Sequence, residues 1–172
     1  MMNIPDRVTD NSSNVHPTRW PSLAAWVASC VMVGMVTGLL FQPGAWYFAL
    51  DQPVFNPPAW LFAPVWTILY VAMGVAAWRI WCLSGTPART AALRRFALQL
   101  ALNAAWTPVF FGLHSIGGAL AVIVLLALAI VVTIQHFHPL DKMAAWMLAP
   151  YLAWVVFAAT LNASLFALNG NF

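Results

Sequence analysis

The stretch Trp46–Tyr70 reads WYFALDQPVFNPPAWLFAPVWTILY and places four prolines and several aromatic residues between two long apolar runs. Pro53, Pro57 and Pro58 each fix φ and remove a backbone donor, so residues 51–58 are expected to form an ordered, extended or turning segment. We interpret this segment as a cap on the mouth of a membrane helix bundle. With the helix that begins near Pro58, it is expected to form one wall of a pocket for a flat apolar ligand.

The composition indicates an integral membrane protein. Hydrophobic residues make up 63% of the 172 residues and charged residues only 6%, whereas about a quarter of the residues of a soluble domain are charged. The net charge of +3 therefore bears on membrane topology, and no nucleic-acid partner is expected. Cys30 and Cys82 both lie in apolar runs, which favours buried free thiols over a disulfide.

Five apolar runs follow one another, and each is long enough to cross a hydrocarbon core of about 30 Å as a helix. The sequence thus predicts an all-α integral membrane protein with a bundle of five transmembrane helices in residues 21–169. A disordered polar tail is expected over residues 1–20 and a short tail over residues 170–172. The runs are Pro21–Phe41, Pro58–Cys82, Arg95–Leu113, Ile116–Gln135 and Met143–Leu168.

All seven basic residues fall on one side of the predicted bundle, and Lys and Arg are retained on the cytoplasmic side. We therefore expect a cytoplasmic N-terminus and an outside C-terminus, in a bacterial cell membrane, with the segment Trp46–Pro58 also outside. The basic residues are Arg7, Arg19, Arg79, Arg89, Arg94, Arg95 and Lys142.

Three of the runs contain a proline together with tryptophans, namely Pro64 in the second run, Pro108 in the third and Pro150 in the fifth. Such helices tend to face protein or a cavity, because the carbonyl that proline frees needs a partner. The fourth run has neither proline nor an aromatic residue and is expected to face mainly lipid. Any pocket is therefore predicted among the first, second, third and fifth helices.

One face of the third run carries Gln99, Asn103, Trp106 and Phe110. A carboxamide in mid-span is costly unless it is paired, so this face is expected to point inward. Two interpretations of Asn103 remain open. Its side chain can bond a neighbouring helix, for example near a carbonyl freed by proline, or it can contact a ligand. The two interpretations do not exclude each other.

The fifth run places five residues at intervals of four: Trp146, Pro150, Trp154, Ala158 and Asn162. Trp154 and Ala158 predict a flat wall beside a gap, although ordinary packing in which Ala158 lets a helix approach is the alternative. Trp146 is better explained as an interfacial anchor.

On the second run Trp66 and Tyr70 share a face, while Trp60 and Trp78 near its ends are expected to be interfacial anchors. Small residues recur every four positions on the first run and on the third. Such seams suit close contact within the chain or in a dimer. They are Gly34 and Gly38 on the first run, and Ala97, Ala101 and Ala105 on the third.

Several kinds of site have no matching pattern in the sequence. The span interiors contain no acidic residue, and no metal-binding spacing, phosphate loop or Ser-His-Asp set is recognisable. No metal site is therefore predicted. Proton-coupled transport usually needs a carboxylate inside the membrane, so an ion-coupled transporter is disfavoured.

Four motifs resemble the tryptophan-rich sensory protein family, TspO, also called translocator protein or peripheral benzodiazepine receptor. They read WYxxLxxP from Trp46, NPPxWxFxPVWxxLY from Asn56, LNxxW from Leu102 and PYxxWxxFAxTLN from Pro150. The resemblance covers residues 21–169. It implies a five-helix, often homodimeric membrane protein that binds porphyrins, sterol-like lipids such as cholesterol, and benzodiazepine-type or isoquinoline ligands.

The resemblance also implies a set of ligand-binding positions, which coincide with the inward faces described above. Trp66 and Trp154 are further implied to support light- and oxygen-dependent porphyrin breakdown, and they are the two candidate catalytic residues. Gln52 stands where the family often has lysine, and residues 161–172 lack the tyrosine and basic residue of the animal cholesterol motif, which weighs against cholesterol recognition there. The implied ligand-binding residues are Tyr47, Pro57, Trp66, Asn103, Trp106, Trp154 and Ala158.

The leading hypothesis is a membrane receptor or sensor that binds porphyrin and regulates or assists its transport. Indole rings suit the flat apolar ring of a porphyrin, and Asn103 and Tyr47 suit its polar edge. Porphyrin is then a ligand, and no cofactor is required. The alternatives are a porphyrin-degrading photo-oxidative enzyme and a lipid or sterol transporter. Neutral indoles cannot act as acid, base or nucleophile at pH 7, so an enzyme would use them as oxidation partners.

Overall fold

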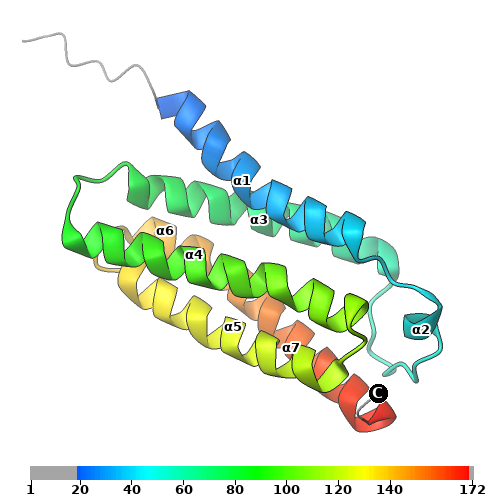
Figure 1. Cartoon of the computed structure of the whole chain (residues 1–172). Helices are drawn as coiled ribbons and strands as arrows, with labels where there is room; N and C mark the ends of the chain where they lie inside the picture. The colour runs from blue at the N-terminus through cyan, green and yellow to red at the C-terminus, as the bar shows by residue number, and fades with distance from the viewer. Residues whose placement is uncertain (1–18, 171–172) are drawn as a thin grey trace, which may run out of the picture.

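The computed structural model of the protein describes residues 19–170, and nearly all of them are helical (Figure 1). Five long helical segments run back and forth along one axis, and a short helix lies in the loop that follows the first of them. The elements are α1 (Arg19–Leu40), α2 (Ala45–Phe48), α3 (Ala59–Trp81), α4 (Pro87–Thr107), η1 (Pro108–Gly112), α5 (Ile116–Phe137), α6 (Lys142–Met147) and α7 (Ala149–Asn169).

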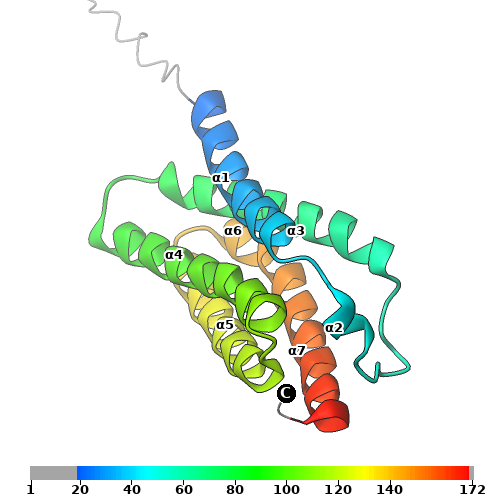
Figure 2. The same cartoon turned by 45° about the vertical axis from the view of Figure 1, so that its right-hand side comes forward.

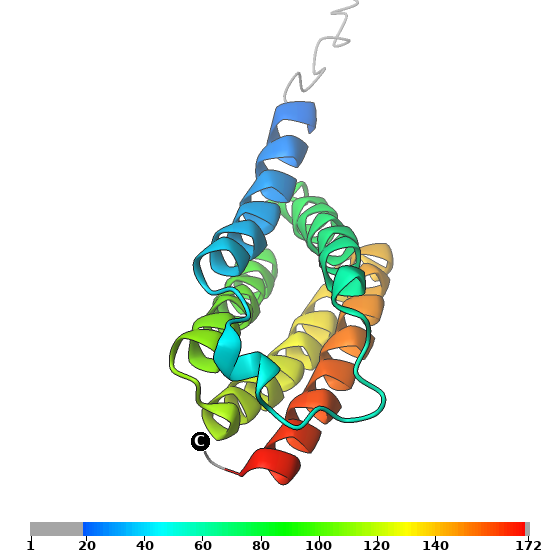
Figure 3. The same ribbon diagram turned by 90° about the vertical axis from the view of Figure 1, so that its right-hand side faces the viewer.

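The long helices form a ring in the order α1, α3, α7, α5 and α4, which closes where α4 contacts α1. Figure 3 views this ring along its axis, and Figure 2 shows the same arrangement from an intermediate angle. The loop of residues 41–58, which includes α2, crosses one end of the ring. The predicted cap on the mouth of the bundle therefore lies where the sequence places it.

Side chains and prolines start the helices that line this ring. Thr86 accepts a hydrogen bond from the backbone N–H of Arg89 at 3.2 Å, and Pro87 occupies the first turn of α4. Ser115 caps α5 in the same way through Gly118, at 3.2 Å. Such caps satisfy orphan N–H groups of a first turn, and proline there loses no hydrogen bond.

Four helical segments are long and apolar enough to cross a membrane: Trp20–Leu40, Ala59–Trp81, Ile116–Phe137 and Lys142–Asn169. They make the chain an all-helical protein of the integral, multi-pass kind. The third predicted run differs, because the α4 helix that contains it carries three arginines in its first half. This run also changes its hydrogen-bonding pattern at Pro108, where a π turn begins and the Leu113 N–H bonds the Pro108 carbonyl at 2.9 Å.

The prediction of one continuous helix over Met143–Leu168 is wrong. The chain breaks at Leu148, which ends α6 and precedes α7, so Pro150 lies in the first turn of a new helix. Proline in a helix interior removes a hydrogen bond and clashes with the carbonyl four residues earlier, whereas in a first turn it does neither.

The prediction that the fourth run faces mainly lipid is also wrong. One stripe of α5 is buried against α4 and α7, while Val124, Leu125 and Leu128 on the opposite face are exposed. Aliphatic residues alone pack well between helices, so the lack of proline and aromatic residues does not indicate lipid exposure. The buried stripe is Ile116, Ala119, Ile123, Leu126, Ile130, Thr133 and Phe137.

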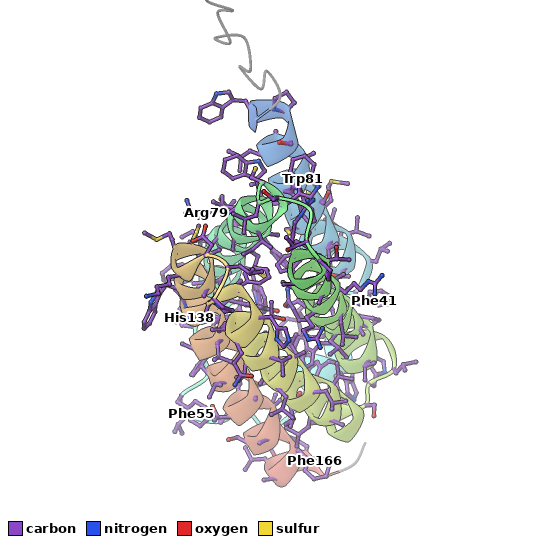
Figure 4. All side chains as sticks on the ribbon, turned by 90° about the vertical axis from the view of Figure 1, so that its left-hand side faces the viewer. Phe41, Phe55, Arg79, Trp81, His138 and Phe166 are labelled. Carbon is purple, nitrogen blue, oxygen red and sulfur yellow. The ribbon has the colours of Figure 1, made fainter. Side chains whose placement is uncertain are left out.

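The basic residues of the described part of the chain lie toward the end of the bundle opposite the loop, and Figure 4 labels one of them, Arg79. Arg79 at the end of α3 pairs with Asp141 before α6, with an N–O distance of 2.8 Å. The side chain of Arg89 lies 5.9 Å from the ring centroid of Trp81. Arg7 and most of the predicted polar tail fall outside the described residues, while Arg19 and Trp20 already belong to α1.

Trp78, which is expected to be an interfacial anchor, is half-buried, and its indole N–H donates to the Ser22 hydroxyl at 3.1 Å, which joins the end of α3 to the start of α1. One expectation for this end needs correction. Cys82 is exposed at the end of α3, whereas Cys30 is buried in the core as predicted, and both thiols are free.

The small residues of α1 and α3 bring these two helices together. A Cβ added at Gly74 would lie 2.5 Å from Val27 Cα, and one at Gly34 would overlap the Tyr70 ring. The first seam thus packs within the chain at Gly34. On α4, by contrast, Ala97 and Ala101 are exposed on the outer surface.

Candidate functional site

A hydrogen-bonded cluster of polar side chains joins α3, α4 and α7 in the middle of the bundle. The Tyr70 hydroxyl donates to Asn103 Oδ1 at 2.5 Å, and Asn103 Nδ2 donates to the Tyr151 oxygen at 3.1 Å. The Tyr151 hydroxyl in turn donates to Gln99 Oε1 at 3.0 Å. All four side chains are buried, which confirms that this face of the third run points inward.

Asn103 therefore bonds neighbouring helices, as one of its two interpretations required. Its partners are the tyrosine hydroxyls of α3 and α7 rather than a carbonyl freed by proline. Because its carbonyl oxygen and its amide nitrogen are both engaged, a ligand reaches only the remaining lone pair and N–H of this amide.

Trp66 lies directly beside this cluster. Its ring stacks on Tyr70 with centroids 5.5 Å apart and meets the edge of Tyr151 at 6.3 Å. Tyr70 and Tyr151 are buried, while Trp66 is only half-buried. Trp66 thus presents an aromatic surface backed by rigid tyrosines, and the predicted shared face of Trp66 and Tyr70 is confirmed.

A line of aromatic rings connects α3 through α7 to the loop. Trp154 lies 5.9 Å from Phe62 of α3 and 5.5 Å from Phe157, and Phe157 lies 6.4 Å from Phe55 of the loop. The indole Nε1 of Trp154 is buried and has no hydrogen-bond partner among residues 19–170. A buried donor without an acceptor costs about 1–3 kcal/mol, so this N–H is able to donate to an acceptor atom that reaches it.

Trp106 belongs to a second aromatic group, nearer the mouth. Its ring stacks on Phe110 at 5.1 Å, and Tyr47 of α2 meets Phe111 edge-on at 5.4 Å. The Trp106 indole N–H donates to Asn162 Oδ1 at 3.2 Å. Trp106 and Trp154 therefore differ in hydrogen bonding, since of these two indoles only Trp154 has an unpartnered buried N–H.

Hydrogen bonds tie the loop over this end of the bundle. The Asn169 amide, at the end of α7, accepts from the Asp51 N–H at 2.9 Å and donates to the Asp51 carbonyl at 3.1 Å. Gln52 donates to the Tyr47 carbonyl at 3.0 Å and accepts from Asn56 at 2.9 Å. The segment 51–58 is thus held at its first residue, and Pro57 is half-buried within it.

Six of the seven predicted site residues fall into three groups. Trp66 and Asn103 lie around the tyrosine cluster, and Tyr47 and Trp106 share the ring contacts of the mouth. Trp154 lies in the aromatic line between α3 and α7. Ala158 is half-buried on α7 against the same core as Trp154. Within the described part of the chain, no hydrogen bond or ring contact joins Pro57 to the other six residues.

The predicted wall on the fifth run extends over only part of its length. Trp146 is 69% exposed and Pro150 is exposed, whereas Asn162 is buried. Four residues advance a helix by about 400°, so a strict interval of four drifts by about 40° per step, and the break at Leu148 adds to the change of direction. The face that lines the interior includes Tyr151, which the reasoning from intervals of four missed.

Asn169 was also missed, because nothing in the local sequence indicates a partner more than a hundred residues away.

Two hollows of the surface lie apart from the predicted residues. One of about 360 Å³ lies between α1 and α4, beside Met32, Val36 and Ala104, and one of about 110 Å³ lies between α5 and α6.

The fold and these side chains define a class of protein: an all-helical, multi-pass membrane protein with a tryptophan- and tyrosine-rich interior under a hydrogen-bonded loop. Residues 26–168 match the TspO/MBR family, and the chain belongs to that family.

Relatives from distant organisms resemble most of the chain. Protein CrtK of Rhodobacter capsulatus is 40% identical over 147 residues, which cover 85% of this chain and 91% of the relative. The tryptophan-rich sensory protein of Cereibacter sphaeroides is 40% identical over 152 residues, covering 88% and 94%. The human translocator protein is 39% identical over 144 residues, covering 83% and 81%.

Proposed function

We propose that this chain is a membrane receptor that binds flat, largely apolar molecules, tetrapyrroles foremost, between α3, α4 and α7 beneath the loop. The observation that carries the proposal is the buried, unpartnered N–H of Trp154 within a line of aromatic rings. A porphyrin combines a flat ring that stacks on indoles with carboxylates that accept hydrogen bonds. The names of relatives, sensory protein and translocator protein, support a role in sensing or in assisting transport.

The proposed contacts follow from the environment of each side chain. Trp66 offers a half-buried ring as one wall, and Trp154 offers a ring and a hydrogen-bond donor on the other. Ala158 leaves room one turn from Trp154. Tyr47 and Pro57 form the side toward the loop, and Trp106 and Asn103 mainly hold the helices that carry these walls. We propose the same walls for sterol-like lipids and for benzodiazepine-type or isoquinoline ligands.

Equilibrium binding to the purified protein tests this proposal, with protoporphyrin, a sterol and an isoquinoline carboxamide as probes. Trp154→Phe keeps an aromatic face but removes the donor, so protoporphyrin affinity should fall about 5- to 10-fold, the worth of one hydrogen bond. The matched control is Trp60→Phe, because Trp60 is 72% exposed. Unchanged affinity in Trp154→Phe, or an equal loss in Trp60→Phe, would place the ligand elsewhere.

A second function, light- and oxygen-dependent breakdown of porphyrin, is favoured by the stacking of Trp66 on Tyr70 at 5.5 Å, because both rings are oxidisable and would lie beside the ligand. The double variant Trp66→Phe, Trp154→Phe should keep much of the binding and lose any light-dependent porphyrin loss. Breakdown at the wild-type rate in this variant would leave the indoles as a binding surface only. Product formed in the dark without oxygen would point to a different chemistry.

In the membrane we propose five transmembrane segments, with α4 and η1 as the third. The basic end would face the cytoplasm of a bacterial cell, and the loop and the C-terminus would lie outside. A reporter fused at the C-terminus and active only in the cytoplasm would overturn this orientation. The exposed Ala97 and Ala101, flanked by Leu98 at 58% exposure, support a homodimer through α4. Ala101→Trp should then give a monomer in mild detergent.

A further inference from the structure

The hollow of about 110 Å³ lies toward the basic end of the bundle and shares no lining residue with the proposed ligand site. It separates the end of α5 from α6 and the start of α7. Two rows of side chains line it. Ile134 and His138 are four residues apart at the end of α5, and the second row crosses from the end of α6 into the start of α7. The lining residues are Ile134 and His138 on one side and Ala145, Trp146 and Ala149 on the other.

The two rows have the same gradient of polarity. On α5 the apolar Ile134 precedes His138, which lies just past the last residue of the helix. On α6 the exposed Lys142 lies one turn before Ala145 and Trp146, on the same face. Because the two helices run in opposite directions, the polar ends of both rows meet at the end of the bundle. Figure 4 shows His138 and Arg79 at this end.

The charge at the polar end is positive. Asp141, the acidic residue of the α5–α6 connection, pairs with Arg79 at 2.8 Å and accepts from the Ala144 N–H at 3.1 Å. Among the described residues, none that is acidic pairs with Lys142. Trp146 is 69% exposed beside the hollow, a position that suits an indole at a membrane–water interface.

We propose that this hollow binds an anionic phospholipid. The phosphate would lie against the Lys142 ammonium and the N–H of the His138 imidazole, and one acyl chain would fill the apolar part along Ile134, Ala145 and Ala149. A zwitterionic phospholipid has the same chains but no net charge. Each basic residue near an anionic surface contributes enough attraction to change affinity about fivefold, so the hollow selects by headgroup charge.

Lipid selectivity of the full chain in nanodiscs tests the headgroup contact. Spin-labelled phosphatidylglycerol and phosphatidylcholine are compared by the fraction of each that the protein immobilises. The double variant Lys142→Gln, His138→Gln should lower the preference for phosphatidylglycerol about fivefold or more. Arg94→Gln is the matched control, because Arg94 is an exposed arginine at the same end but on α4. It should leave the preference nearly unchanged.

The acyl contact is tested separately with phosphatidylglycerol brominated along its chains, which quenches nearby tryptophan. At low ratios of lipid to protein, tryptophan quenching should be smaller in Trp146→Phe than in the wild type. Ala149→Leu narrows the hollow and should also reduce the quenching. The proposal is overturned by equal immobilisation of the two lipids by the wild type, or by equal losses in Arg94→Gln and the double variant. It is overturned as well if Trp146→Phe changes the oligomeric state and not the lipid preference, since the hollow would then hold a second copy.

Discussion

Replacing Trp154 and Trp106 by phenylalanine, one at a time, compares two half-buried indoles that differ in hydrogen bonding. The Trp106 N–H donates to Asn162 Oδ1 at 3.2 Å, and Asn162 is 1% exposed. Trp106→Phe therefore leaves a buried acceptor short of its partner, at a cost of about 1–3 kcal/mol. Trp154→Phe removes a donor that has no partner, so it relieves a penalty of similar size.

The loss of ring area is the same in both variants and largely cancels in the difference. The two effects of about 1–3 kcal/mol each add up in the difference between the variants. We expect the lower part of that sum, because hydrogen bonds between membrane helices average only about 0.6 kcal/mol. Trp106→Phe should then be less stable than Trp154→Phe by about 2–3 kcal/mol. For a chain of this size that difference corresponds to about 4–12 °C in melting temperature.

Thermal unfolding of both variants without ligand, in the same detergent, measures this difference. Binding should show the opposite order, because the ligand loses its donor in Trp154→Phe and keeps it in Trp106→Phe. Equal melting temperatures for the two variants would refute the reasoning, since the Trp154 N–H would then have a partner, such as a water molecule, in the free protein.

Three further variants test other contacts. Tyr151→Phe removes the hydroxyl between Asn103 and Gln99 and should cost about 1–3 kcal/mol in unfolding experiments; a loss below 0.5 kcal/mol, roughly the worth of a weak surface contact, would contradict a structural role for the cluster. Asn169→Ala removes both bonds to Asp51 and should speed proteolysis of the loop severalfold without lowering the melting temperature by more than about 3 °C, and an unchanged cleavage rate would show that the loop is held by its rings alone. Ala158→Phe should fill the space beside Trp154 and weaken protoporphyrin more than it lowers stability, whereas wild-type affinity in a folded variant would move the site away from α7.

The sequence by itself determined the class of this protein and several of its inward faces. A chain with 63% hydrophobic and 6% charged residues has no stable arrangement in water, so membrane helices follow from composition. Gln99 and Asn103 had to be buried and paired, because a carboxamide in hydrocarbon is costly and their spacing fixes one helix face. The closely spaced prolines of residues 51–58 likewise restrict the loop locally.

Tertiary structure alone decided which partners these groups find. The bonds of Asn103 to Tyr70 and Tyr151, and of Asn169 to Asp51, join residues 33 to 118 positions apart, and such pairs depend on the order of helices around the ring. The break at Leu148 shows the same limit, since a proline marks where a helix is weak but packing decides on which side of it the helix ends. Whether an indole N–H is satisfied, as in Trp106, or left free, as in Trp154, depends on a neighbouring helix that local sequence does not specify.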